Sequence, residues 1–283
     1  MLRGIYTSAS GMLVEQARQD VITNNLANVD TTGFKKDLAI FRDEPSMDMH
    51  RIDDNRKIFG KKLELDFRPY IGRMGTGASI DEITTIHEQG ILQTTNNKTD
   101  LALIGDGMFA VESPNGIKYT RAGNFRVGAE GFLVDANGNK VMALKEPAIM
   151  NKESIITNPD GEFALNASYV PLDGAEDFKV DLDGKIYVNG ESAYRLMIVN
   201  FDDPRHLKKI GYNYYEPADE RVGFGRFGEN TKIEQGMLEK SNVNIVREMV
   251  NMITVMRAYE SNQKAIATHD GTLGTLISKV GAR

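Results

Sequence analysis

No cysteine occurs among the 283 residues of the sequence. This absence excludes disulfide bonds, thiol nucleophiles and cysteine-rich metal sites together. Two explanations stay open: a protein that never needed a thiol, or a chain that is exported unfolded and in which a free thiol would be a hazard. Tryptophan is absent as well, but its absence excludes no class of protein.

The sequence also lacks a long apolar run and an excess of basic residues. No hydrophobic stretch approaches the length of a membrane-spanning helix, so none is predicted. The N-terminus lacks the basic start, apolar stretch and cleavage site of a secretory signal. The formal net charge of -6, without a dense basic patch, argues against a nucleic-acid partner and gives no reason to expect an anionic membrane surface.

The clearest periodicity lies at the C-terminal end of the chain. Apolar or seam-facing positions recur there in steps of four and three, a 3.5-residue repeat that predicts a helix lying along other helices. Gln263 and Asp270 place polar groups in this seam. Either a surface helix tolerates them, or they fix register and partner number. The repeat consists of Ile245, Met249, Met252, Met256, Tyr259, Gln263, Ile266, Asp270, Leu273, Ile277 and Val280.

Two further features concern the surface of this predicted helix. Glu260 and Lys264 are spaced to form an ion pair, which would contribute about 0.3–0.5 kcal/mol if exposed. Met249, Met252 and Met256 form an adaptable apolar stripe, which suits a core and an interface equally.

The first thirty residues predict a second, weaker helix from about Leu2 to Asn28. Polar Gln16 and Gln19 interrupt its apolar stripe. Such a helix is marginal alone in water, since most helical stability comes from packing an apolar face. It therefore needs a partner. Residues 28–33, Asn-Val-Asp-Thr-Thr-Gly, favour a turn that ends it.

Between the two helices the pattern changes twice. Residues 41–74 are charged and lack a clear period, which predicts an extended linker or arm, with a short strand at 63–67. From residue 75 to 237, apolar runs alternate with turn dipeptides that are typical of hairpins. Residues 238–242 lead into the last helix, with Ser241 or Asn242 as its N-cap. The turn dipeptides are Asn115-Gly116, Asn137-Gly138, Asp160-Gly161, Asp183-Gly184 and Asn189-Gly190.

These patterns predict an α+β fold. A mostly β central domain, hairpin-rich and sandwich- or barrel-like, is flanked by N- and C-terminal amphipathic helices that form a coiled-coil-like layer. The predicted segments are residues 1–34 for the first helix and its turn, 35–74 for the linker, 75–237 for the β-rich domain and 238–283 for the heptad helix.

No motif predicts catalytic, cofactor or metal chemistry. Three Gly-x-Gly pairs lack the third glycine and the strand–helix context of a nucleotide site. His87-Glu88 begins like a zinc-protease helix, but no second histidine follows at the required spacing. Residues 181–184 resemble a calcium loop without its later ligands, so a β-turn is the better interpretation. We expect no enzyme, no cofactor and no small-molecule substrate.

Three sets of motifs resemble one protein family. Residues 24–35 read Asn-Asn-Leu-Ala-Asn-Val-Asp-Thr-Thr-Gly-Phe-Lys. Ser-Asn-Val-Asn at 241–244 precedes Glu-Met-Val-Asn-Met-Ile at 248–253 and Arg-Ala-Tyr-Glu-Ser-Asn at 257–262. The centre carries His-Glu-Gln-Gly at 87–90, Thr-Thr-Asn-Asn at 94–97 and Tyr-Thr-Arg-Ala-Gly-Asn-Phe at 119–125. Together they are similar to the signatures of bacterial flagellar rod and hook proteins, and to the rod proteins more than to the hook.

The resemblance implies a structural subunit of the flagellar basal-body rod in the cell envelope. Such a subunit is exported by the flagellar type III system without a cleaved signal peptide. It polymerises with copies of itself into the axial tube that transmits torque to the hook, and it contacts neighbouring rod and hook proteins and the export apparatus. Met256 and the charged linker at 41–74 depart from the usual family pattern. The linker leaves both the distal and the proximal rod position open.

The resemblance also implies which residues mediate assembly. Asn28 either caps the first helix or bonds across subunits, and Phe34 is either an anchor on a neighbouring chain or a local staple. The N-terminal signature residues are Asn24, Asn25, Leu26, Ala27, Asn28, Thr31, Gly33, Phe34 and Lys35. The C-terminal set is Ser241, Asn242, Val243, Met249, Val250, Met252, Ile253, Arg257, Tyr259, Glu260, Ile266, Leu273 and Ile277.

An alternative from another class is a secreted adhesin or glycan-binding β module with coiled-coil oligomerisation helices. It predicts a discrete soluble oligomer and a ligand-binding face on the β domain.

Overall fold

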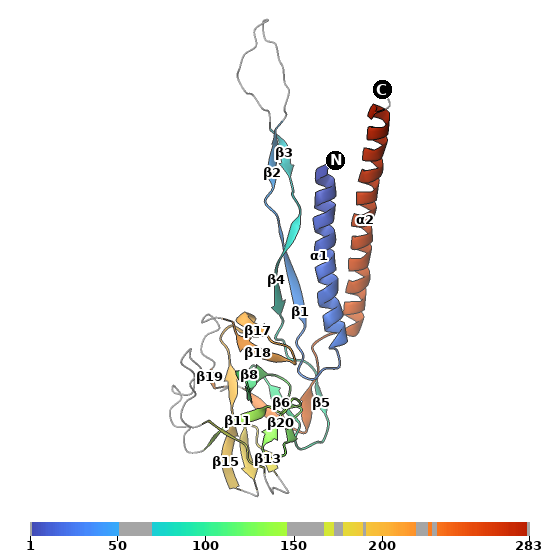
Figure 1. Ribbon diagram of the computed structural model, residues 1–283. Coiled ribbons are helices and arrows are strands. Elements are labelled where there is room, and N and C mark those ends of the chain that lie inside the picture. Colours follow the sequence, from blue (N-terminus) through green and yellow to red (C-terminus); the bar gives the residue numbers. More distant parts are fainter. Residues whose placement is uncertain are drawn as a thin grey trace. The chain divides into compact units, whose positions relative to one another are not determined.

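The computed structural model describes residues 2–50, 70–145, 167–172, 178–188, 191–218, 226–227 and 231–281. The chain divides into two compact units (Figure 1). Unit 1 comprises Met1–Asn24, Asp37–Thr84 and Val246–Arg283, and unit 2 comprises Asn25–Lys36 and Thr85–Ile245. Each unit therefore combines segments that lie far apart in the sequence. The predicted α+β class, with a helix at each end and an antiparallel β region between them, is confirmed.

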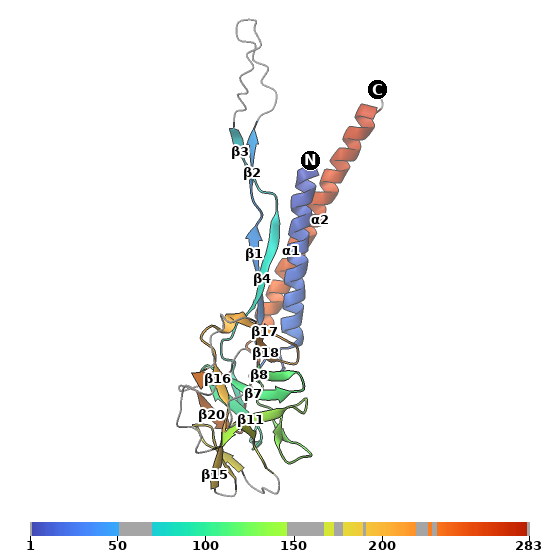
Figure 2. The same cartoon turned by 60° about the vertical axis from the view of Figure 1, so that its left-hand side comes forward.

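Unit 1 contains most of both helices, α1 (Leu2–Ala27) and α2 (Ile245–Gly281), within the segments where the sequence predicts them. The two helices run antiparallel and side by side (Figures 1 and 2). Gly4 lies against His269 and Gly11 against Asn262, so close that a Cβ on either glycine would come within 2.9 Å of that side chain. The weak first helix therefore finds a partner within its own chain.

Unit 1 also contains a β ribbon. Strand β1 (Asp37–Asp43) pairs with β4 (Ala78–Thr85), and β2 (Met47–His50) pairs with β3 (Tyr70–Met74). The predicted linker thus contributes three strands to the ribbon. The strand predicted at 63–67 lies outside the described residues.

Unit 2 consists of antiparallel strands, with the order β13-β14-β15-β11-β7-β8-β18-β17 in its largest sheet. Two smaller pairings join β6 to β20 and β5 to β21. The strands are β5 (Leu92–Thr94), β6 (Leu101–Ile104), β7 (Met108–Ser113), β8 (Gly116–Thr120), β9 (Arg126–Val127), β10 (Leu133–Val134), β11 (Lys140–Lys145), β12 (Ala167–Tyr169), β13 (Phe178–Val180), β14 (Lys185–Val188), β15 (Glu191–Leu196), β16 (Ile198–Asn200), β17 (Leu207–Lys209), β18 (Tyr214–Pro217), β19 (Arg226–Phe227), β20 (Lys232–Gln235) and β21 (Met237–Glu239), with a short 3-10 helix, η2 (Pro204–His206), before β17.

The predicted turn dipeptides can be followed in three places. Asn115-Gly116 joins the antiparallel pair β7 and β8, and Asp183-Gly184 joins β13 and β14, which confirms both hairpins. Asn137-Gly138 lies between the paired strands β10 and β11. The dipeptides at 160–161 and 189–190 lie outside the described residues.

Strand β7 lies at the centre of unit 2 and is buried on both faces. Its alternate residues point to opposite sides, so Phe109 and Val111 join one apolar cluster while Met108 and Ala110 join another. The Phe109 ring also contacts the Phe125 ring edge-on, with centroids 5.1 Å apart. Both clusters are closed within unit 2, which gives the β region a core of its own.

Candidate functional site: the junction of the terminal signatures

The N-terminal signature does not stop at the end of α1 but continues into unit 2. Gly33 donates its backbone N–H to the carbonyl of Glu239, at 2.8 Å, on the last strand before α2. Gly33 has a φ of +67°, and a Cβ there would lie 2.5 Å from the backbone nitrogen of Ala122. Only glycine fits this left-handed position against the neighbouring chain segment. The N-terminal signature therefore meets the strand that precedes the C-terminal signature.

A buried carboxylate holds this meeting point together. One Glu239 oxygen, Oε1, lies 2.6 Å from Lys35 Nζ, and the other, Oε2, lies 2.6 Å from Arg121 Nε. The backbone N–H of Gly90 donates to Oε1 at 2.7 Å. The side chains of Lys35, Arg121 and Glu239 are between 1% and 5% exposed. We call these three side chains and the Gly90 N–H the Glu239 cluster.

Backbone carbonyls accept the remaining hydrogen bonds of the two cations. Lys35 Nζ donates to the carbonyl of Glu88 at 2.6 Å. Arg121 donates to three carbonyls on both sides of the β6–β7 turn, those of Leu103, Gly105 and Gly107. A buried charge group is tolerated when its donors and acceptors are satisfied in this way.

The electrostatics keep the Glu239 carboxylate charged. Burial alone would raise the pKa of Glu239, but the charges of Arg121 and Lys35 outweigh burial and lower the pKa below its usual value. Burial lowers the pKa of Lys35, and the Glu239 carboxylate opposes that change. One anion thus balances two cations that come from different parts of the sequence.

Asn242 ties the signatures together a second time. Its Oδ1 accepts the backbone N–H of Lys36 at 2.8 Å, and its Nδ2 donates to the carbonyls of Ile86 at 2.9 Å and Glu88 at 3.2 Å. The predicted N-cap role of Asn242 or Ser241 is therefore wrong. Helix α2 begins later, at Ile245, and Ser241 Oγ instead accepts the N–H of Val243 at 3.3 Å.

Phe34 packs inside its own chain. Its side chain is 2% exposed, and Lys209 Nζ lies 3.8 Å from the centre of its ring. The same ammonium donates to the carbonyl of Lys35 at 2.9 Å. A ring this buried is not presented to a neighbouring chain, and the contact with Lys209 comes from a remote segment rather than from a local staple.

The rest of the N-terminal signature lies on the last turn of α1 and the loop after it. Asn24 Nδ2 donates to Asp37 Oδ2 at 3.4 Å, and Asn28 Oδ1 accepts the Thr31 hydroxyl at 3.2 Å. Asn25 is 2% exposed, whereas Leu26 is half-buried and Ala27 is exposed.

Helix α2 has two different faces. Met252, Tyr259, Ile266 and Leu273 are half-buried and share a stripe with the fully buried Val255. The other predicted seam positions lie outside that stripe. The exposed apolar residues of the helix are Ile245, Val246, Met249, Val250, Ile253, Met256, Leu276, Ile277 and Val280. We call Val246, Met249, Val250, Ile253 and Met256, which are 48–72% exposed, the exposed α2 stripe.

Some predictions for the polar positions of α2 can also be compared with the structure. Gln263 and Asp270 are exposed, as a surface position requires. Glu260 and Lys264 form no ion pair within the described part of the chain, so the predicted pairing is wrong. Arg257 is exposed as well.

The central residues of the junction, Arg121 and Glu239, carry no recognisable signal in the sequence. Arg121 lies within the quoted motif at 119–125, but nothing marked it as the member that pairs with a carboxylate. Glu239 was treated only as part of the approach to the last helix. A lone charged residue beside a strand carries no local signal of burial, and only the contact between distant segments reveals it.

The described residues contain no group of three or more His, Asp or Glu side chains arranged to hold a metal ion. Neither described helix combines the length and the apolar character needed to cross a membrane.

Fold and junction together define a class: an α+β protein with a helix at each end and a β unit in which the segment after the first helix and the strand before the last helix are joined at one buried carboxylate. Three family profiles match the chain within the same segments. Residues 5–35 match "Flagella basal body rod protein", residues 102–188 match "Flagellar hook protein FlgE/F/G D1 domain", and residues 234–279 match "Flagellar basal body rod FlgEFG protein C-terminal".

Relatives match over nearly the whole length. The flagellar basal-body rod protein FlgG of Borreliella burgdorferi is 36% identical over 279 residues, 97% of each chain. FlgG of Bacillus subtilis is 32% identical over 289 residues, covering 98% of this chain and 99% of the relative. The flagellar hook-basal body complex protein FlhO of Bacillus subtilis is 26% identical over 298 residues, 99% of each. The chain therefore belongs to the flagellar rod and hook-basal body protein family.

Proposed function

We propose that this structural subunit of the flagellar rod polymerises into the axial tube that transmits torque to the hook. The terminal helices form an inner, coiled-coil-like layer in which each helix lies along helices of other copies. Because the patches that meet are not self-complementary, repeated contacts extend an open helical array rather than closing a ring. The family membership and the FlgG names of the relatives support a rod subunit.

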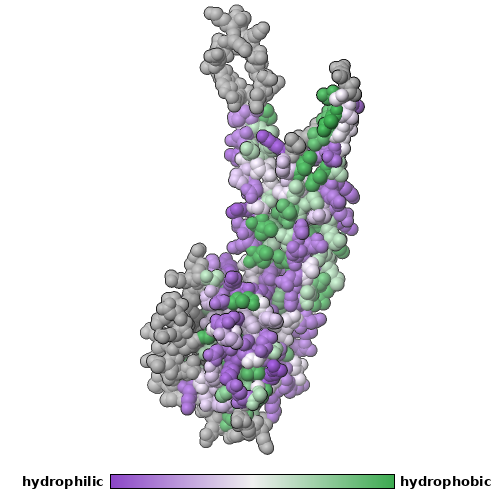
Figure 3. All heavy atoms as spheres, viewed as in Figure 1, coloured by the Kyte–Doolittle hydropathy of each residue, from purple (hydrophilic) through white to green (hydrophobic). Residues whose placement is uncertain are grey.

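The exposed α2 stripe carries the proposal. Its five apolar side chains occupy a face of α2 other than the one containing Val255. Apolar surface gathered on one helix face marks an interaction site, because burying it releases roughly 25 cal/mol for each Å² removed from water. Helix α1 adds Tyr6 and Leu13, which are 70% and 66% exposed. Figure 3 shows hydrophobic residues gathered along the helices.

In this proposal each segment of the chain keeps the role predicted for it from the sequence. Residues 1–34 and 238–283 supply the assembly contacts, residues 35–74 form the arm, and residues 75–237 form a sandwich- or barrel-like outer domain. Export proceeds through the flagellar type III system without a cleaved signal peptide, and the subunit resides in the basal body. No step requires catalysis, a cofactor or a nucleic acid.

A deletion tests this proposal. Removing residues 271–283 shortens α2 and takes away the apolar Leu276, Ile277 and Val280 but leaves every residue of unit 2 in place. We expect the truncated protein to keep a folded β unit, measured by hydrogen exchange, and to fail to restore rods and motility in a strain that lacks the intact gene. Complete rods seen by electron microscopy of purified basal bodies would contradict the proposal.

A further inference from the structure

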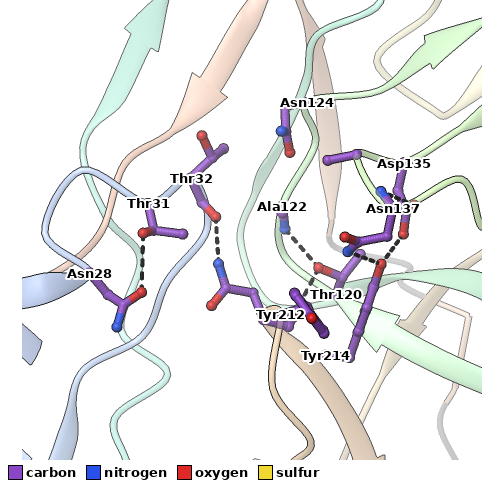
Figure 4. A pocket seen from close by; sticks show the side chains of 12 residues that line it. Asn28, Thr31, Thr32, Thr120, Ala122, Asn124, Asp135, Asn137, Tyr212 and Tyr214 are labelled. Atoms are coloured by element: carbon purple, nitrogen blue, oxygen red, sulfur yellow. Dashed lines mark hydrogen bonds between the residues drawn. The ribbon is translucent and has the colours of Figure 1, made fainter. Parts of the chain in front are cut away.

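A pocket of about 360 Å³ with both polar and apolar lining opens in unit 2, partly within the N-terminal signature (Figure 4). Its lining comes from the turn after α1, the end of β8 and the segment following it, the β10–β11 turn and the β17–β18 turn. The volume lies at the lower end of the range for small-molecule sites, roughly 300–1,000 Å³. The Glu239 cluster contributes no residue to this pocket.

The pocket offers no free charge to a ligand. No Lys or Arg lines it. Asp135 is its one carboxylate, and that group already accepts the backbone N–H groups of Asn137 and Asn139, each at 2.9 Å, the Asn139 amide at 3.1 Å and the hydroxyl of Tyr214. An anion therefore finds no cation here, and a metal ion finds no open carboxylate. The fitting ligand is neutral.

Uncharged polar groups at the pocket do remain open. Among the described residues, the side-chain amide of Asn124, the Oδ1 of Asn137 and the hydroxyl of Thr32 accept or donate no hydrogen bond. Amides supply both donors and acceptors, and a hydroxyl can act as either. Such a set matches a ligand that carries several hydroxyl groups.

An aromatic ring stands at the rim of the pocket. Tyr212 is 82% exposed, in a turn where Gly211, Tyr212 and Asn213 have φ values of +75°, +47° and +60°. Left-handed backbone at two consecutive non-glycine residues costs of order 1–2 kcal/mol for each residue. The buried Asn213 holds the turn, since its amide donates to the carbonyl of Thr32 at 3.0 Å. The ring is therefore preset toward solvent before any ligand arrives.

We propose that this pocket binds a neutral saccharide. The Tyr212 ring stacks on the apolar C–H face of a sugar, and Asn124, Asn137 and Thr32 bond its hydroxyl groups. The site is a binding site without chemistry. It goes beyond the assembly function, because α1 and the exposed α2 stripe contribute no residue to it, although Asn28, Thr31 and Thr32 from the turn after α1 line it.

Nuclear magnetic resonance of the full-length 15N-labelled chain tests the proposal. The probes are cellobiose, maltose and the β-1,4-linked dimer of N-acetylglucosamine, with inorganic phosphate as a charged comparison. We expect at least one disaccharide to shift the side-chain amide signals of Asn124 and Asn137 with a Kd of about 1 mM. Tyr212→Ala should weaken this binding roughly fivefold to tenfold, whereas Tyr212→Phe should retain it.

Tyr70→Ala, at another exposed aromatic residue (58%), is the matched control and should bind as the parent does. Asn124→Ala provides a second variant, because this exposed side chain makes no hydrogen bond among the described residues and its loss leaves folding intact. No response to any of the three disaccharides at about 10 mM would overturn the proposal. So would a response to phosphate alone, or pocket signals that move only with protein concentration, which would assign the pocket to a second copy. Rod assembly in the deletion experiment is measured independently of each of these results.

Discussion

The two units of this chain differ in how far they bury their apolar side chains. In unit 2, β7 and its neighbours bury residues such as Leu101, Phe109 and Val111 completely. In unit 1, Val255 is buried to the same degree, but the exposed α2 stripe on the same helix faces solvent. A unit that closes its own core can fold alone, whereas an apolar helix face left open to solvent is the kind of surface that marks an interaction site. The comparison therefore separates the unit with a closed core from the unit with an exposed apolar helix face.

The contact between α1 and α2 also involves polar side chains. Where the helices meet, glycines face polar side chains: Gly4 faces His269, and Gly11 faces Asn262. Glycine allows a close backbone approach at these two positions. The pair is held together without using the apolar residues that remain on the outside of α2.

The largest expected effect concerns Glu239. The substitution Glu239→Gln leaves Lys35 and Arg121 as buried cations without a counter-charge. It should therefore lower the free energy of unfolding by about 3–5 kcal/mol. Urea unfolding measures the loss, and hydrogen exchange should locate it in unit 2. Glu216→Gln, at an exposed position on β18, is the matched control. A loss no larger than that of the control would mean that the cluster does not stabilise the junction.

Gly90→Ala tests the same junction through packing. A Cβ at this position would lie 2.0 Å from the backbone carbonyl of Lys240, so one segment must move, at a cost of about 2–3 kcal/mol. Thermal unfolding of the variant measures the cost. Gly75→Ala is the control, because nothing lies within 4 Å of a Cβ there. Equal melting temperatures for the two variants would show that the segment before α2 is not held tightly.

Two residues on α2 contrast the faces of one helix. Val255 is 0% exposed, so Val255→Ala should reduce the stability of unit 1 by roughly 2 kcal/mol. Ile253 is 52% exposed, and Ile253→Gln should change the stability of the monomer by less than about 0.5 kcal/mol. Circular dichroism of the helices measures both effects.

The two substitutions should rank in the opposite order when rod assembly rather than stability is measured. Ile253→Gln should impair rod formation more than its stability effect explains, because it places an amide within the exposed α2 stripe. Motility and rod counts in basal bodies give the measurement. Normal rods with Ile253→Gln would remove the stripe from the assembly interface.

The smallest effect is a pH dependence within unit 2. Burial, and then the hydrogen bond to Asp135, raise the pKa of Tyr214 from 10.0 to about 12. The unfolded chain therefore releases this proton at lower pH than the folded chain. The contribution of Tyr214 to the free energy of unfolding is fully present below pH 10 and is lost as the pH rises toward about 12. Urea unfolding between these pH values should show a shallower decline for Tyr214→Phe than for the parent, and an identical slope would contradict this assignment.

Local sequence patterns predicted the elements well because their causes are local. The steps of four and three after Ile245 reflect helix geometry, and Asn115-Gly116 and Asp183-Gly184 favour tight turns wherever they occur. The N-cap prediction failed because Asn242 has stronger partners at Lys36, Ile86 and Glu88, all remote in sequence. Phe34 could not be assigned for the same reason, since its partner Lys209 lies far along the chain.

By itself, the sequence determined the two terminal helices, the hairpins between them and the signatures of the family. A 3.5-residue repeat predicts the spacing of contacts along a helix, but it does not predict which of two adjacent stripes packs against other residues of the same chain. The tertiary structure decided that Val255 faces inward while Met249 and Ile253 stay exposed. It also decided that Glu239 joins Lys35 and Arg121, because a buried charge group is stable only where distant segments bring its counter-charges within 2.6 Å.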